Sequence, residues 1–159
     1  MSQCYLTVVV TLRNLAVRQY RNFHFNSMAL FNGKYLALGP NGAFELETGH
    51  TDAGAKIDAF LEPVLSDWGI GNEKRVRFMY VSARSDGKLK LTQIPDNGAA
   101  LEEEFSPARE DRQSYAPPIP GSRDGRGALW TFRLCNVDGS YFELNKIEVL
   151  PTVLGKKPS

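Results

Sequence analysis

Turn dipeptides constrain the fold of this chain more than any other feature of its sequence. Asn-Gly and Asp-Gly pairs recur at Asn32-Gly33, Asn41-Gly42, Asp86-Gly87, Asn97-Gly98 and Asp138-Gly139. Both pair types adopt the positive φ angles of tight turns, so each one marks a point where an extended strand reverses. The segments between the turns are rich in β-branched and aromatic residues, which favour strands. The sequence therefore predicts an all-β protein.

These turns predict three hairpins, which join 27–31 to 34–38, 75–83 to 88–94, and 128–136 to 141–150. The first hairpin continues into a further strand over 43–47, which makes an N-terminal β-meander. In the last strand, Phe142, Leu144 and Ile147 alternate with polar residues and are expected to face inward. The alternation breaks near Asn145, so we expect a change of register there.

Residues 55–65 fit two kinds of element. Their apolar residues recur at helical spacing over about two turns, and Asp52 precedes them as a candidate N-cap. Pro63 would end or break such a helix. The alternative is a strand over 56–62. We favour the strand, because the neighbouring elements need a partner in a sheet.

The apolar run from Tyr5 to Leu12 predicts a first strand. A bilayer span needs about 20 apolar residues, so this run is too short to be one. No positive residue precedes the run and no small-residue cleavage site follows it, so no secretion signal is expected. A long apolar strand at a sheet edge tends to pair with another chain. Val8 and Val10 are therefore predicted to contact a partner.

Residues 102–127 contain four of the nine prolines and almost no apolar periodicity, which predicts a long loop. Loops of this length in compact domains are usually functional or disordered. A Pro-rich segment stays extended and loses little entropy on docking. Tyr115, Pro117, Pro118 and Ile119 are therefore predicted to dock on a neighbouring protein.

The charge balance bears on nucleic-acid binding, and the cysteine positions bear on disulfide formation. Nineteen Lys and Arg residues against eighteen Asp and Glu residues give a net charge of +1. Proteins that search for nucleic acid carry a basic excess, so no nucleic-acid partner is expected. Cys4 and Cys135 lie near opposite ends of the chain. Synthesis in the cytosol favours free thiols at both positions over a disulfide.

Residues with catalytic or metal-binding potential do not form a motif. The histidines, His24 and His50, have no His or Cys partner at the spacing of a metal site. A Ser or Cys nucleophile needs an oriented base, and no such arrangement is evident. We expect no enzyme activity, no cofactor and no metal. Aromatic residues at alternating strand positions, including Trp130, are expected to lie in the core.

The predicted organisation has two parts and a tail. A first strand and the β-meander occupy 1–54. A β-sandwich, immunoglobulin-like or jelly-roll-like, occupies 55–154 and carries the long loop over 102–127. Residues 155–159 form a frayed tail.

The turn motifs also occur in a recognisable order. They are Phe25-Asn26-Ser27-Met28-Ala29, Asn32-Gly33-Lys34-Tyr35, Gly42-Ala43-Phe44-Glu45-Leu46, Thr51-Asp52-Ala53-Gly54, Ser66-Asp67-Trp68-Gly69, Lys74-Arg75-Val76-Arg77, Ser85-Asp86-Gly87-Lys88-Leu89, Leu129-Trp130-Thr131-Phe132-Arg133-Leu134, Asn136-Val137-Asp138-Gly139, Phe142-Glu143-Leu144 and Ile147-Glu148-Val149-Leu150-Pro151. In this order, from about Asn14 to Leu154, the chain resembles small virion proteins encoded among the tail genes of tailed bacteriophages. The motifs are turns and not catalytic groups, so no catalytic residue carries over.

The resemblance implies a non-enzymatic component of the tail tip or baseplate. Such a protein is made in the cytoplasm of the bacterial host and assembles with other tail proteins and with copies of itself. The Pro-rich segment is longer than the loop expected in that group, which suggests a contact specific to this particle.

Two other roles fit the sequence. A carbohydrate- or receptor-binding module would recognise a host-surface glycan and would expose its tryptophans, Trp68 and Trp130. A structural component would bury them. A head-to-tail connector protein is the other alternative.

Overall fold

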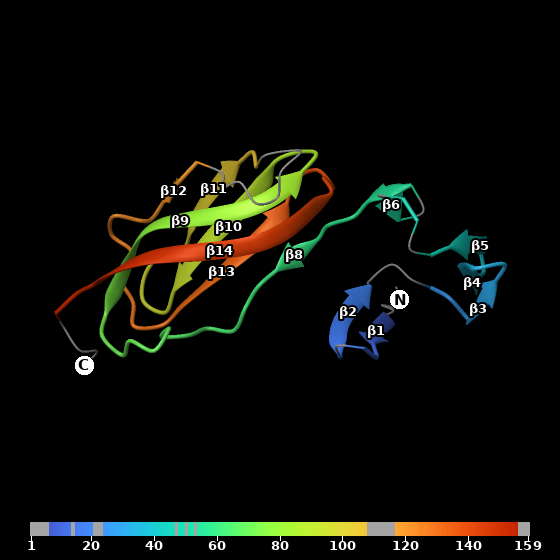
Figure 1. Ribbon diagram of the computed structural model, residues 1–159, viewed down its shortest axis with the longest axis horizontal. Coiled ribbons are helices and arrows are strands. Elements are labelled where there is room, and N and C mark those ends of the chain that lie inside the picture. Colours follow the sequence, from blue (N-terminus) through green and yellow to red (C-terminus); the bar gives the residue numbers. More distant parts are fainter. Residues whose placement is uncertain are drawn as a thin grey trace, which may run out of the picture. The chain divides into compact units, whose positions relative to one another are not determined.

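The computed structural model describes residues 7–13, 15–20, 24–46, 48–49, 51–52, 54–107 and 117–155. Strands make up 57% of this part of the chain and it contains no helix, which confirms the all-β prediction (Figure 1). The chain divides into two compact units, Met1–Ala55 and Lys56–Ser159. The sequence placed the boundary between residues 54 and 55.

The first unit contains two small antiparallel sheets. One pairs β1 (Thr7–Thr11) with β2 (Ala16–Tyr20), and the other has the order β3 (Ser27–Phe31), β4 (Lys34–Gly39), β5 (Gly42–Glu45). Asn32 and Gly33 have φ angles of 49° and 76° in the turn between β3 and β4. Positive φ at both central residues matches the twist of the flanking strands. This three-stranded sheet is the predicted meander.

Near the boundary of the two units in the sequence, β6 (Thr51–Asp52) pairs with β7 (Ala55–Lys56) in a two-stranded sheet. Gly54, with a φ of 86°, allows the tight reversal between these strands.

The second unit is built from two larger antiparallel sheets. The β9 sheet has the order β12 (Ile119–Pro120), β9 (Lys74–Ser85), β14 (Phe142–Val153). The β10 sheet has the order β11 (Leu101–Phe105), β10 (Leu89–Pro95), β13 (Trp130–Asn136), β8 (Phe60–Leu61).

Both sheets of the second unit contribute to one hydrophobic core. Its buried members are Val76, Met79, Val81, Ala83, Leu89, Leu91, Ile119, Trp130 and Leu134. Phe142, Leu144 and Ile147 of β14 pack against this core, as predicted. The pairing of β14 with β9 shifts register between Leu144 and Lys146, which confirms the irregularity expected at Asn145.

Two of the three predicted hairpins are wrong. β9 and β10 lie in different sheets, and so do β13 and β14. Instead, β14 pairs with β9 from Phe142↔Ser85 to Val153↔Lys74, and β10 pairs with β13 (Figure 1). The turn after β13 does form, because the Ser140 amide donates to the Val137 carbonyl at 3.1 Å. Turn residues reverse the chain, but they do not decide which edge of each strand receives hydrogen bonds.

The segment 55–65 contains no helix, and its strand is shorter than the predicted 56–62. Only Phe60 and Leu61 form β8, which pairs with Leu134 and Cys135 of β13. Ile57 and Leu61, which an alternating strand would place on the core side, are 42% and 44% exposed.

The predicted loop over 102–127 is wrong at its start. Leu101–Phe105 forms β11 along the edge of β10. Lys88 and Lys90 of the second unit form ion pairs with Glu104 and Glu102, at 3.6 and 3.4 Å. Glu102 and Glu104 of the acidic run therefore pair with lysines in and next to β10.

Candidate interaction surfaces

The β1–β2 ribbon exposes an apolar face. Its register places Val10 opposite Val17, and Val8 is two residues from Val10, so the three side chains share one face. Val8, Val10 and Val17 are 51%, 47% and 61% exposed. The structure thus places both valines predicted from the sequence at the surface and adds Val17 to them.

The meander carries a second exposed apolar face. The register pairs Met28 with Ala37 and Leu30 with Tyr35, so these four residues lie on one face. Ala37 is buried, whereas Met28, Leu30 and Tyr35 are 54%, 64% and 54% exposed. The alternation of Met28 with Leu30 was a signal for this face. The sequence predicts these residues only as part of a hairpin strand, without singling them out as a contact surface.

The Pro-rich contact predicted from the sequence is only partly exposed. Pro117 and Pro118 are at the surface. Ile119 is 3% exposed and belongs to the core, where β12 pairs it with Met79 of β9. The prediction that Ile119 docks on a neighbour is therefore corrected. Tyr115 lies outside the described residues.

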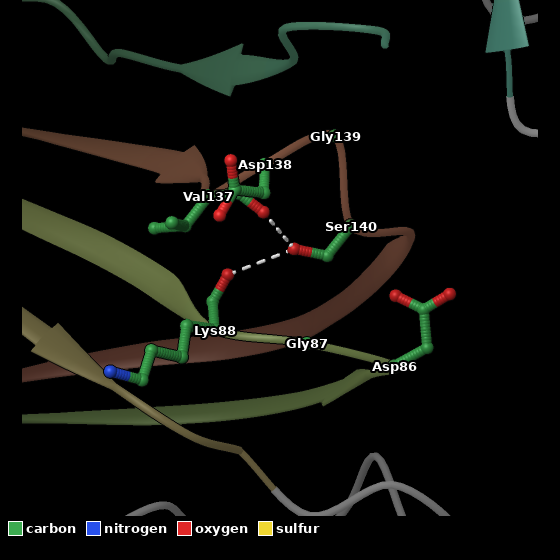
Figure 2. A pocket seen from close by; sticks show the side chains of 7 residues that line it. All are labelled: Asp86, Gly87, Lys88, Val137, Asp138, Gly139 and Ser140. Carbon is green, nitrogen blue, oxygen red and sulfur yellow. Dashed lines mark hydrogen bonds between the residues drawn. The ribbon is translucent and has the colours of Figure 1, made fainter.

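Two connections between the sheets lie side by side at one end of the second unit. We call residues 86–88 the first arch, which joins β9 to β10, and residues 137–141 the second arch, which joins β13 to β14. They line an open pocket of about 400 Å³ (Figure 2). Its lining residues are Asp86, Gly87, Lys88, Val137, Asp138, Gly139 and Ser140.

Backbone and hydroxyl hydrogen bonds tie the arches together. The Val137 amide donates to the Lys88 carbonyl at 3.0 Å. Figure 2 shows the Ser140 hydroxyl reaching both the Lys88 and the Val137 carbonyl oxygens. Across the arches, Asp86 Oδ1 accepts from the Tyr141 amide at 2.8 Å.

Asn136 extends this network to the chain before β8. Its Nδ2 donates to the carbonyls of Ile57 and Ser140 at 2.8 and 2.9 Å. Its Oδ1 accepts from the Ala59 amide at 2.8 Å. The polar groups around the pocket therefore hold the arches and the preceding segment in place, which is a structural role.

The lining of the pocket does not contain a Ser–His pair. None of its lining residues is a histidine, so the Ser140 hydroxyl has no imidazole base beside it there. Across the described part of the chain, no group of three or more His, Cys, Asp or Glu residues is arranged to hold a metal ion. Among these residues, Cys135 of β13 is a free thiol, while Cys4 and His50 fall outside them.

The two tryptophans pack together. The ring centres of Trp68 and Trp130 lie 6.5 Å apart with an interplanar angle of 27°. Trp130 is 1% exposed, and its Nε1 donates to the Gly127 carbonyl at 3.1 Å. Trp68 is partly buried and packs against the core. This pair does not form an exposed stacking platform.

The part of the chain that the structure describes holds no helix with the length and apolar content needed to cross a membrane. No family model, no curated protein sequence and no solved structure gives a significant match to this chain.

Proposed function

We propose that this chain is a non-enzymatic structural component of a tailed-phage virion, in the tail tip or baseplate, that acts through protein–protein contacts. The observation that carries the proposal is the exposure of apolar side chains on both small sheets of the first unit. The partners are other tail proteins and copies of the chain itself. The assignment to a phage tail rests on the order of the turn motifs in the sequence.

Of the two small sheets, the β1–β2 ribbon would be stabilised more by packing against a partner protein. A two-stranded ribbon is marginally stable in water unless it packs against something else. Fully burying a valine is worth roughly 1.5–3 kcal/mol, so covering side chains that are already half-buried gains about half of that each. Val8, Val10 and Val17 together supply enough apolar surface to anchor a contact.

Within this proposal the second unit is the scaffold, a β-sandwich of the immunoglobulin-like or jelly-roll-like kind. The support for this is the single core shared by the β9 and β10 sheets. The protein is made in the cytoplasm of the bacterial host and enters the virion by assembly.

The carbohydrate-binding alternative requires tryptophans at the surface. Trp130 is buried and hydrogen-bonded, so a tryptophan platform for a host glycan is not favoured by this geometry. A head-to-tail connector would use the same kind of protein contacts, and the choice of partner protein in the experiment separates the two roles.

The test is the mass of the full-length chain by light scattering, alone and after mixing with the products of neighbouring tail genes. Whether or not the chain alone forms an oligomer, we expect a complex with at least one of these proteins. The double substitution Val8→Ser/Val10→Ser should weaken it by at least about tenfold, because each buried methyl group contributes to the contact. Val64→Ser is the matched control, since Val64 is 88% exposed in the second unit.

A wild-type chain that forms no complex with any tail protein would rule the proposal out. Equal loss of assembly in Val64→Ser and in the double variant would show that the effect is not specific to the ribbon. Binding to host-surface glycans in place of proteins would move the assignment to the carbohydrate-binding alternative.

A further inference from the structure

The outer edge of β14 is the longest strand edge in the second unit. Among the described residues, β14 has one strand neighbour, β9. The other outer strands are short or acidic: β8 and β12 have two residues each, and β11 carries the run Glu102–Glu104. β14 has twelve residues. A long strand edge presents backbone amides and carbonyls that another strand can pair with.

Irregularities limit the usable part of this edge. Register shifts occur between Leu144 and Lys146 and between Leu150 and Pro151. Bulges of this kind discourage indiscriminate pairing along an edge. Between them, Lys146–Leu150 pairs regularly with β9. Any added strand is therefore directed to these five residues.

The side chains of this regular segment alternate in a self-complementary way. Ile147 and Val149 pack against the core. Lys146 and Glu148 lie on the opposite face, with side chains 56% and 44% exposed, and form an ion pair with each other. The segment thus carries a cation before the central isoleucine and an anion after it.

We propose that two copies of this chain associate by antiparallel pairing of their β14 edges, centred on Ile147. A two-fold axis perpendicular to the sheet places Ile147 opposite the partner's Ile147. The same axis places Lys146 opposite the partner's Glu148, and Glu148 opposite the partner's Lys146. Opposite charges directly across an antiparallel ladder stabilise it, and the two β9 sheets become one continuous sheet.

Other two-fold registers of this segment place unfavourable residues opposite each other. A two-fold axis perpendicular to the sheet keeps each residue and its copy on the same face of the joined sheet. Residues directly opposite each other also share a face, so their numbers differ by an even amount. The centre of the pairing therefore falls on a residue and not between two residues. Centring on Lys146 opposes two lysines, and centring on Glu148 opposes two glutamates. Like charges directly opposite destabilise the ladder. Centring on Val149 places Pro151 opposite the partner's Ile147, where the ring has no amide to donate.

This inference rests on the proposed function and deepens it, because it identifies how a second copy of the chain, one of the proposed partners, would bind. The contact is isologous, because the same segment serves on both sides. It uses the second unit and not the valines of the first, so the two contacts can be separated by substitution.

Charge reversal tests the pairing in the full-length chain. Lys146→Glu opposes two glutamates in each half of the contact, and Glu148→Lys opposes two lysines. Each single variant should associate at least about tenfold more weakly than wild type in sedimentation equilibrium, because like-charge juxtaposition across an interface is costly. An equimolar mixture of the two variants should regain the dimer, since every pair is then opposite in charge.

The double variant Lys146→Glu/Glu148→Lys should also dimerise, because it restores opposite charges with their positions exchanged. Lys56→Glu is the matched control for net charge, since Lys56 forms an exposed ion pair with Asp138 of the second arch, outside the segment Lys146–Leu150. Circular dichroism and thermal unfolding confirm that each variant is folded. Successive amides of a strand point to opposite edges, so exchange should slow with rising protein concentration at whichever of Ile147 and Glu148 has its amide at the outer edge.

The outcomes separate this inference from the proposed function. A dimer unaffected by either single reversal, or a monomer at every concentration, overturns the β14 pairing. A complex with tail proteins that forms regardless would leave the proposed function standing. A β14 dimer that follows the charge pattern, in a chain that binds no tail protein, would support the pairing and sink the proposed function.

Discussion

Gly121 lies directly against the backbone of Val76: a β-carbon at Gly121 would stand 1.9 Å from the Val76 carbonyl oxygen. The Gly121 amide donates to the Arg77 carbonyl at 2.9 Å, which fixes the chain to β9 as it leaves β12. Any side chain at this position would collide with backbone and not with a flexible neighbour.

Gly121→Ala should therefore destabilise the second unit by at least about 3 kcal/mol, at the upper end of overpacking effects. Urea unfolding followed by tryptophan fluorescence measures the change. Gly71→Ala is the control, because a β-carbon at Gly71 has nothing within 4 Å. Equal stability of the two variants would contradict the close approach.

Lys74 has a side chain that is completely buried. Its Nζ donates to the Ala128 carbonyl and lies 5.9 Å from the centre of the Trp68 ring. The aliphatic stem fills space in the same way as an apolar side chain. Lys74→Ala should cost about 2–4 kcal/mol through the cavity it leaves, whereas Lys74→Met should stay within about 1.5 kcal/mol of wild type. If chemical denaturation shows the two variants to be equally unstable, the ammonium contacts outweigh the packing.

Asn136 makes side-chain hydrogen bonds to Ile57, Ala59 and Ser140. Asn136→Ala removes all of them and should lower stability by about 2–3 kcal/mol, since a typical hydrogen bond contributes about 1 kcal/mol. The loss should be local as well. Hydrogen exchange at the Ala59 amide should accelerate more than exchange at Met79, which lies in the centre of the core. Uniform acceleration would show that Asn136 does not hold the segment before β8 specifically.

Gln93 is 1% exposed, and its Nε2 donates to the Pro120 carbonyl at 3.0 Å. Gln93→Glu keeps the shape and replaces the donor with an acceptor that faces a carbonyl. Burial raises the pKa of such a carboxyl above its value of about 4.3 in the unfolded chain. The variant should thus be close to wild type at low pH and lose stability as the pH rises above about 4.3, by up to about 1.4 kcal/mol per pH unit.

Thermal unfolding of wild type and Gln93→Glu between pH 4 and pH 8 tests this sign. The difference between the two proteins should widen as the pH increases. A constant difference would mean that water reaches the carboxylate at this position.

The local parts of the fold were predictable because turn chemistry and alternation are local signals. Asn32-Gly33 indicated the β3–β4 hairpin, and the break at Asn145 indicated the register shift in β14. The pairing partners were not predictable in the same way. Asp86-Gly87 reverses the chain as expected, but the partner of β9 is β14, which lies far along the sequence.

The same difference between local signals and long-range pairing decides which candidate contacts were predicted correctly. Val8 and Val10 were identified from a single run of β-branched residues, and the structure leaves both exposed. Ile119 was assigned to the surface because proline surrounds it, yet β12 buries it beside Met79. The self-complementary charges of β14 have no meaning until the sheet order makes β14 an outer strand.

The exchange of strands between the sheets at the two arches has a consequence for synthesis. The main pairing partner of β9 is β14, and that of β10 is β13. Neither pairing can form until the C-terminal part of the chain has left the ribosome. Long-range pairing of this kind slows folding, because a large loop must close before its contacts form. During most of translation the emerging chain can therefore pair β10 only with β11, and β9 only with the two residues of β12. A chain truncated before β13 lacks the main partner of each sheet.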